Sequence, residues 1–350
     1  MNTEQKEVQE NEYGNWRKFE IDEDEAICVE AGYKPFNELL NEEFYELEKL
    51  QNSECFSGIS TGFKSLDEVL TGLKKNDLIV IGGQPASGKT AMAMSIMLNV
   101  AVDQNLPVLY ISLESSALEL SKRIIRMRSG ISGEKLDGAG KLELNEWAQL
   151  ECKMKDVENA PIFIEERPNL TIGHIRNIVR TQIEKNGIRL VIIDYMQLIK
   201  GRVDCRINRE QEMSSISREL KSLAKECQVP IVAISSLSRQ LSNRQNTNSN
   251  SRPQISDLRD SGSIEFESDV ILLLYPRDFP GLAGDDFDRN KITLIIAKNR
   301  DGECRDINLE YDWRELRISE FEEDLGVFCS RISAESAMNV ENFDETDSPF

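Results

Sequence analysis

Short apolar runs alternate with longer amphipathic segments through the middle of the chain. The apolar runs predict strands at 77–82, 107–113, 161–164, 190–194, 230–235, 270–275 and 292–297. The segments between the earlier runs predict helices near 89–104, 116–129, 142–155, 171–186 and 209–227. Strands that alternate with helices indicate a parallel sheet covered on both faces. We therefore expect one α/β domain over residues 58–318, in which 305–311 joins the last strands as a closing meander.

The two ends of the chain have a different pattern. Residues 1–36 are polar and acidic with weak periodicity, which predicts a flexible arm, and residues 319–350 predict a disordered acidic tail. Between the arm and the domain, residues 37–57 predict a helix and a linker. The helix carries an apolar stripe at Leu39, Leu40, Phe44, Leu47 and Leu50. This stripe must pack either on the chain's own domain or on a neighbouring subunit.

Net charge is informative about binding partners only when it is calculated separately for each part of the chain. The whole chain has 42 basic and 62 acidic residues, a formal charge of −20. Residues 1–57 account for −11 and residues 319–350 for −8, which leaves the central domain near neutral at −1. The overall acidity therefore does not exclude a nucleic-acid partner, because the domain must be judged on its local patches.

Composition excludes several classes of protein. No apolar run approaches the ~20 residues that a membrane helix needs, and the N-terminus has no apolar signal region. The seven scattered cysteines form no Cys-x-x-Cys pair, which argues against a zinc ribbon or a disulfide framework. His174 is the one histidine, so a multi-histidine metal site is ruled out. These features predict a cytoplasmic protein with reduced thiols and no membrane partner.

The strongest chemical signal is the stretch Gly83-Gln84-Pro85-Ala86-Ser87-Gly88-Lys89-Thr90. It matches the pattern G-x-x-x-x-G-K-[ST], follows an apolar run and opens a helical segment, which is the context that a phosphate-binding loop requires. The backbone N–H groups of such a loop and the helix N-terminus attract phosphates. Lys89 is expected to reach the β- and γ-phosphates of ATP, and Thr90 to bind Mg²⁺.

Two carboxylates follow apolar runs. Asp194 ends the run Leu190–Asp194, and because open α/β sheets bind ligands at the carboxyl ends of their strands, it is expected to hold Mg²⁺ through water. Glu114 follows the run Val108–Leu113, where a carboxylate can orient and deprotonate the water that attacks a γ-phosphate. A simple acidic residue at a helix start is an equally weighted alternative for Glu114.

Basic residues near strand ends are weaker signals. Lys298 and Arg300 leave the run Ile292–Ala297 on the same side, and such a pair can reach a γ-phosphate of this or an adjacent subunit. Spacing alone favours ordinary solvated charges. Two basic polar loops also follow strands, and their arginines include Arg202, Arg206, Arg239 and Arg252. Such loops suit phosphate contacts to a single strand of DNA, with ordinary surface loops as the alternative.

Several strings together resemble the ATPase domain of DnaB-type replicative helicases, in the family's order over about residues 58–312. They are 60–73 (STGFKSLDEVLTGL), the phosphate-binding loop, 111–114 (ISLE), 193–198 (IDYMQL), 208–225, 233–239 (AISSLSR), 252–265 (RPQISDLRDSGSIE) and 297–302 (AKNRDG). The phosphate-binding loop is generic. The string SDLRDSGSIE is far more specific, and it separates the chain from recombinase-type and clock-type relatives.

The resemblance implies a RecA-like P-loop NTPase with a mostly parallel central sheet flanked by helices. Domains of this type form a ring, usually a hexamer, with ATP between subunits. The resemblance assigns Lys89, Thr90 and Asp194 to the nucleotide and Mg²⁺, and Gln197 to the nucleotide site. The segment 37–50 matches the linker helix that docks on the next subunit of the ring.

The resemblance also implies roles in catalysis and DNA binding. Glu114 matches the catalytic base, and Lys298 and Arg300 match the γ-phosphate sensor and the arginine finger that act on the neighbouring subunit's ATP. Three further positions match the loop that follows single-stranded DNA in the central channel, namely Arg259, Asp260 and Gly262.

This chain departs from the family's pattern in two places. The family has a helical N-terminal domain before the linker, which forms a collar and binds primase, where this chain has an acidic arm. This departure weakens the expectation of a primase partner and of a stand-alone hexamer. Ser236 stands where the family usually has a glutamine that links the γ-phosphate to the DNA loop. A serine is too short for that hydrogen bond, so coupling is expected to run differently or through Gln197.

Two functions are consistent with these residues. The leading hypothesis is a replicative-type helicase or translocase that hydrolyses ATP at subunit interfaces to move along single-stranded DNA, with a helicase loader or other replication proteins as further partners. The alternative is an ATP-gated module that binds DNA or a replication protein without unwinding. The missing collar, Ser236 and the acidic ends favour the alternative. A small-molecule kinase is disfavoured because no arginine-rich lid segment is evident.

Overall fold

The computed structural model describes residues 56–138, 140–201, 209–238, 252–258, 261–276 and 290–320, together with 35–37, 39–41, 44 and 47. The chain divides into two compact units, Met1–Glu54 and Cys55–Phe350. In the first unit, residues 37, 39–41, 44 and 47 are helical, which confirms the predicted helix at these positions, and residue 36, which was predicted to lie in the arm, is helical as well. The predicted arm at 1–36 and tail at 319–350 lie almost wholly outside the described residues.

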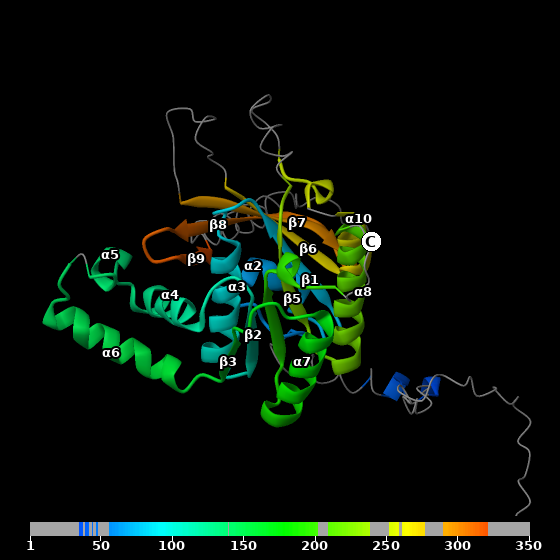
Figure 1. Cartoon of the computed structure of the whole chain (residues 1–350), viewed down its shortest axis with the longest axis horizontal. Coiled ribbons are helices and arrows are strands. Elements are labelled where there is room, and N and C mark those ends of the chain that lie inside the picture. The colour runs from blue at the N-terminus through cyan, green and yellow to red at the C-terminus, as the bar shows by residue number, and fades with distance from the viewer. Residues whose placement is uncertain are drawn as a thin grey trace, which may run out of the picture. The chain divides into compact units, whose positions relative to one another are not determined.

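A single mixed sheet forms the centre of the second unit (Figure 1). Its strands are β1 (Leu78–Gly83), β2 (Val108–Ser112), β3 (Ile162–Glu165), β4 (Leu190–Asp194), β5 (Ile231–Ser236), β6 (Val270–Pro276), β7 (Lys291–Asn299), β8 (Asp306–Asp312) and β9 (Arg317–Glu320). They lie in the order β3-β2-β4-β5-β1-β6-β7-β8-β9. The strands from β3 to β6 are parallel, whereas β6, β7, β8 and β9 pair antiparallel. This arrangement confirms the mostly parallel sheet and the closing meander.

The described helices largely follow the predicted ones. They are α2 (Lys64–Leu70), α3 (Lys89–Leu98), α4 (Ala117–Ser129), α5 (Gly133–Leu136), α6 (Leu144–Glu158), α7 (Ile172–Asn186), α8 (Arg209–Cys227) and α10 (Ser261–Glu267). The segment predicted as one helix over 89–104 ends its α-helical part at Leu98 and continues as a π-helical turn over Asn99–Asp103. The short helices α2, α5 and α10 were not predicted, because four to seven residues are too few to show a helical period.

Alternate residues of the parallel strands face two separate hydrophobic cores. In β1, Ile79 and Ile81 pack with α2, α3 and α4, whereas Leu78 and Val80 pack with α7 and α8. All four side chains are buried. Because successive strand residues point to opposite faces, a continuous apolar strand requires helices on both sides, as the sequence pattern indicated. In Figure 1, α3 and α8 lie on opposite sides of the strands.

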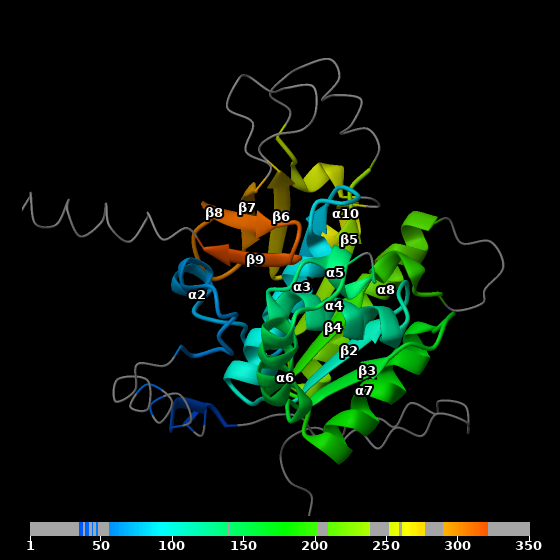
Figure 2. The ribbon, with the colours of Figure 1, turned by 90° about the vertical axis from the view of Figure 1, so that its left-hand side faces the viewer.

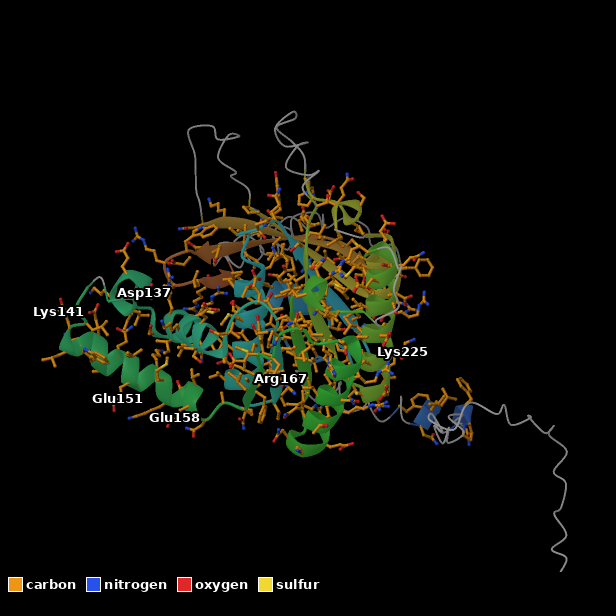
Figure 3. The ribbon with its side chains drawn as sticks, viewed as in Figure 1. Asp137, Lys141, Glu151, Glu158, Arg167 and Lys225 are labelled. Carbon is orange, nitrogen blue, oxygen red and sulfur yellow. The ribbon has the colours of Figure 1, made fainter. Side chains whose placement is uncertain are left out.

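The helices α4, α5 and α6 stand beside the α3 face of the sheet, as the turned view shows (Figure 2). None of the residues of α6 is buried. Glu151 and Glu158 of this helix lie on its outer side (Figure 3). This helix therefore contributes little to the core and is held to the domain mainly through α4.

The strand β9 was not predicted. It has a single buried apolar residue, Ile318, within four residues, so it shows no alternation that the sequence could reveal. Because β9 ends at Glu320, the sheet extends two residues beyond position 318, where the predicted domain ended. The extra strand completes the antiparallel hairpin that brings the segment after β8 back over α3.

Candidate nucleotide site

The loop after β1 is a tight turn that requires glycine at two positions, at one for lack of space and at the other because of its backbone conformation. Gly83 is the last residue of β1, and a Cβ atom placed on it would lie 2.3 Å from Ser87 Oγ. Gly88 has φ +92° and immediately precedes α3, so its backbone lies in the left-handed region that glycine favours. The loop thus aims the N-terminus of α3 at the carboxyl edge of the sheet, as the sequence motif predicted.

Lys89 folds over this loop. Its ammonium group donates to the carbonyl oxygen of Gln84 at 2.6 Å. Burial lowers the pKa of Lys89 to about 8, although the negative charges of Asp194 and Glu114 oppose this effect. Within the described residues, the hydroxyl of the buried Ser87 in the same loop has no hydrogen-bond partner. A phosphate group would supply partners for both side chains.

Asp194 lies at the end of β4, next to the start of α3. Its Oδ2 atom accepts hydrogen bonds from Thr90 Oγ1 at 3.0 Å and from the Tyr110 hydroxyl at 2.9 Å. Burial raises the pKa of Asp194, an effect that these two hydrogen bonds partly oppose. The predicted neighbours Thr90 and Asp194 are therefore in direct contact, although 104 residues separate them in the chain.

This pair of oxygen ligands fits Mg²⁺. Magnesium typically takes one or two protein oxygens and completes its octahedral shell with water and substrate phosphates. Thr90 Oγ1 and an Asp194 carboxylate oxygen are such ligands at the phosphate loop. No group of three or more His, Cys, Asp or Glu residues suited to a metal ion exists in the described parts of the chain. The described donors thus match an ion that depends on the nucleotide for most of its ligands.

A cavity of about 520 Å³ opens in front of the loop. The exposed Glu114, two residues after the end of β2, lines it together with Lys89 and Thr90. The backbone N–H of Leu113 donates to the carbonyl oxygen of Asp194 at 2.7 Å, which fixes the two strand ends side by side. The structure thus brings Glu114, Lys89, Thr90 and Asp194 into one cavity, as expected for a carboxylate that acts on a phosphate.

The lining of the cavity also contains residues that sequence reasoning missed. Tyr311 and Trp313, at the end of β8, line it with their ring centroids 4.4 Å apart. Arg123 of α4 lines it as well. No local motif marks these residues. They arrive here because β7 and β8 each reverse direction, so that the end of β8 returns to the edge where the parallel strands end.

Gln197 lies beside the cavity and contacts its wall through β5. Its amide nitrogen donates to Ser235 Oγ at 2.8 Å, and its amide oxygen accepts from the N–H of Ser236 at 3.4 Å. Ser236 itself lines the cavity, whereas Gln197 does not. Gln197 therefore contacts the lining of the cavity through Ser236 of β5. Its direct contact with a nucleotide stays a prediction.

Lys298 and Arg300 lie at the opposite edge of the sheet. Asn299, which separates them, pairs with Val270 at the start of β6, whereas Gly83 pairs with Leu274. Four strand residues correspond to about 13 Å. Neither cation lines the cavity of its own chain. The antiparallel direction of β7 therefore separates both cations from this chain's own phosphate loop, and their action on a neighbouring subunit stays a prediction.

The family model for the DnaB-like helicase C-terminal domain matches residues 58–322. The chain belongs to this family. It is 38% identical to the replicative DNA helicase DnaB of Geobacillus stearothermophilus and 36% identical to the replicative DNA helicase DnaC of Bacillus subtilis, in each case over 282 residues. These alignments cover 80% of this chain and 61% of each relative, so the chain spans about three fifths of their length.

Solved structures agree with the family assignment. A structure described as an ATPase domain superposes with a TM-score of 0.75 at 31% identity, over 82% of this chain and 99% of that domain. A DnaB-like replicative helicase, described together with its interactions with primase, superposes with a TM-score of 0.73 at 31% identity, over 83% of this chain and 68% of that one. The expected RecA-like architecture is thereby confirmed for this DnaB-like domain.

Most of the predicted DNA-binding positions of this DnaB-like domain lie outside the described residues. These are Arg202, Arg206, Arg239, Arg259 and Asp260. Arg252 is described, and its exposed guanidinium group pairs with Asp306. Gly262 is exposed in the first turn of α10, with open space where a side chain would lie. No described helix is long and apolar enough to cross a membrane.

Proposed function

We propose that this protein is an ATP-hydrolysing helicase or translocase of the replicative type, which moves along single-stranded DNA as a ring, in the cytoplasm. One observation carries the proposal. The ATP cavity lies at one edge of the sheet and the Lys298–Arg300 pair lies at the other. A chain built in this way can complete its nucleotide site only by contact with a second copy, which favours hydrolysis at subunit interfaces.

In the proposed site, each side chain has a distinct task. Lys89 leaves the carbonyl oxygen of Gln84 and binds the β- and γ-phosphates, whose negative charge favours its protonated form. Thr90 and Asp194 hold Mg²⁺, which neutralises phosphate charge when it is bound. Glu114 orients the attacking water and accepts its proton. Tyr311 and Trp313 line the same cavity, where a nucleobase can stack on aromatic rings.

The DNA partner is proposed from the family and from the basic loops. We expect the arginines around 202–206 and 239–262 to contact phosphates of a single strand in the central channel of a ring, as the resemblance to the family suggests. The close relatives of this domain bear the name of replicative DNA helicases. A homo-hexamer, and a helicase loader or another replication protein as partner, follow from the same family and are part of the proposal.

The test is steady-state ATPase activity measured with and without single-stranded DNA over a range of protein concentrations. Activity that rises steeply with protein concentration and is stimulated by DNA supports a ring whose sites are completed by neighbours. Unwinding of a forked duplex would then distinguish a helicase from a translocase. Activity that is indifferent to DNA and proportional to protein concentration would contradict the proposal.

The alternative is an ATP-gated module that binds DNA or a replication protein without unwinding. The residue that favours it is Ser236, which lines the cavity but is too short to make the hydrogen bond of the glutamine usual in the family. If this alternative holds, ATP changes the affinity for DNA while a forked duplex stays intact. Replacing Ser236 with glutamine would then be the natural attempt to restore unwinding.

A further inference from the structure

A buried acidic residue, Asp269, lies where Lys298 and Arg300 leave the sheet. It directly precedes β6, and its side chain is 5% exposed. Its Oδ2 atom accepts a hydrogen bond from the backbone N–H of Leu78 at 2.9 Å. Its Oδ1 atom accepts one from Arg300 Nη1 at 3.2 Å. Asp269 therefore joins the start of β1 to the residue that follows β7.

Lys221 neutralises the buried carboxylate from the other side. Its ammonium group, on α8, pairs with Asp269 and donates to the carbonyl oxygen of Asn76 at 2.8 Å. Asp77 is 3.9 Å away from the same ammonium group. Burial and the negative charge of Asp269 raise the pKa of Asp77 to about 6. A buried carboxylate is stable when it is paired and hydrogen-bonded, and Asp269 satisfies both conditions.

Arg300 is held at one point and is otherwise exposed. Its backbone N–H donates to the carbonyl oxygen of Asp269 at 3.0 Å, so both its main chain and its side chain contact the same residue. Yet its side chain is 66% exposed. A guanidinium group has five N–H donors in a planar fork, so a single contact with Asp269 leaves most of the fork facing solvent.

Lys298 is secured differently. Its ammonium group donates to the carbonyl oxygens of Glu265 and Ser268, each at 2.6 Å, at the end of α10. Two of its three N–H donors are thus used within the chain. Of these two cations, Arg300 is the one that keeps most of its N–H donors exposed to solvent while one of them is held by Asp269.

We propose that Asp269 is a positioning residue for Arg300. By holding one Nη atom and the backbone N–H, Asp269 fixes the direction in which Arg300 projects, so that the remaining donors meet the γ-phosphate in the adjacent copy of the chain. The proposal rests on the proposed function, because it takes Arg300 to act across a subunit interface. A purely structural role, in which Asp269 only joins β1 to β7, is the competing explanation.

Mixed oligomers separate these explanations. Lys89→Ala removes the phosphate lysine but keeps Asp269 and Arg300, whereas Asp269→Asn keeps the phosphate loop. Alone, Asp269→Asn is expected to lower kcat for ATP at least tenfold with KM changed less than twofold. Mixed with the Lys89→Ala chain, it should recover activity, because some interfaces then combine an intact loop with a correctly held Arg300.

Two further variants test whether a low kcat arises from destabilisation of the domain or from loss of any nearby carboxylate. Asp269→Asn leaves Lys221 buried without its main partner, which destabilises proteins. The double variant Asp269→Asn/Lys221→Met removes both charges, and we expect the same low kcat and the same recovery. Asp301→Asn is the matched control, because Asp301 adjoins Arg300 but pairs at 3.3 Å with the partly exposed Lys74. It should keep wild-type kcat.

Each outcome of these measurements either supports or overturns the role of Asp269 in positioning Arg300. Wild-type kcat in Asp269→Asn, or a low activity that mixing with the Lys89→Ala chain fails to recover, would overturn the positioning role. Arg300→Ala is measured in the same mixtures. If Arg300→Ala itself is not recovered, the trans arrangement of the proposed function is wrong, and the role of Asp269 falls with it. If Arg300→Ala is recovered and Asp269→Asn is not, only the positioning role is wrong.

Discussion

At the scale of single residues, the phosphate loop depends on a lysine whose charge is sensitive to its surroundings. Without a nucleotide, the ammonium group of Lys89 contacts a backbone carbonyl, and burial lowers its pKa to about 8. Phosphates would raise this pKa again, because a negative charge nearby favours the protonated form. If ATP binds at Lys89 as proposed, we expect its binding to be coupled to proton uptake by Lys89 at pH values near and above about 8.

This coupling has a definite sign. Below a pH of about 8, Lys89 is already protonated in the free protein and takes up no proton. Between that pH and the higher pKa that Lys89 has next to phosphates, ATP binding is expected to be accompanied by proton uptake, so the affinity falls as the pH rises through this range. Isothermal titration calorimetry in two buffers of different ionisation enthalpy measures this uptake. Lys89→Arg is the control, because arginine stays charged throughout and should show no uptake there.

The aromatic wall of the cavity gives a second residue-scale prediction. If a nucleobase stacks on Trp313, then Trp313→Ala should weaken ATP binding by about 1 kcal/mol, or about fivefold. Trp147→Ala is the matched control, because Trp147 is an exposed tryptophan of α6 that does not line the cavity. Fluorescent nucleotide titration of both variants measures the effect. Equal affinities in the two variants would place the base elsewhere.

At the scale of elements, α10 is too short to be stable by itself. It has seven residues, and isolated helices of this length do not persist in water. Its C-terminal carbonyl groups are held instead by the ammonium group of Lys298, from the neighbouring strand. A positive charge at a helix C-terminus is favourable, and a charged hydrogen bond is stronger than a neutral one. The stability of α10 thus depends on its contact with Lys298 of β7.

Removing this contact should destabilise the domain. Lys298→Met keeps the length of the side chain but loses its donors, and we expect a loss of about 1–2 kcal/mol in the free energy of unfolding. Urea denaturation of the nucleotide-free protein measures it. Lys225→Met, at an exposed position of α8 (Figure 3), should change stability by less than about 0.5 kcal/mol. A loss no larger than in this control would show that Lys298 does not support α10.

At the scale of the whole molecule, the direction of each strand decides where functional residues lie. The parallel strands β1, β2 and β4 end at the same edge and bring the phosphate loop, Glu114 and Asp194 together. The antiparallel β7 ends at the other edge and carries Arg300 away from them. In the proposed ring, Arg300 of one copy would lie next to the phosphate loop of the adjacent copy.

The corresponding prediction concerns mixed oligomers. Arg300→Ala and Lys89→Ala should each lose at least nine tenths of the ATPase activity, because each disables the site at every interface. An equimolar mixture should recover a measurable fraction, since some interfaces join an intact loop to an intact Arg300. Activity of the mixture is measured against the sum of the separate variants. A mixture no more active than that sum would contradict an arginine that acts across the interface.

Much of the fold was accessible from the sequence, because its signals are local. Each predicted apolar run became a strand to within about two residues, since continuous burial on both faces needs a continuous apolar stretch. The stretch from Gly83 to Thr90 was likewise evident, because its conformation depends on its own glycines and on the helix that follows. The strand β9 and the short helices escaped prediction, because they owe their existence to neighbours in space.

The alternation of strands and helices, the phosphate-binding loop and the family of the chain could all be inferred from the amino-acid sequence. Each of these depends on residues close together in the chain. The tertiary structure alone decided that Thr90 contacts Asp194, that Tyr311 and Trp313 line the same cavity, and that Asp269 holds Arg300 at the opposite edge. These contacts depend on strand order and direction, which arise from the packing of the whole sheet and leave no local pattern in the sequence.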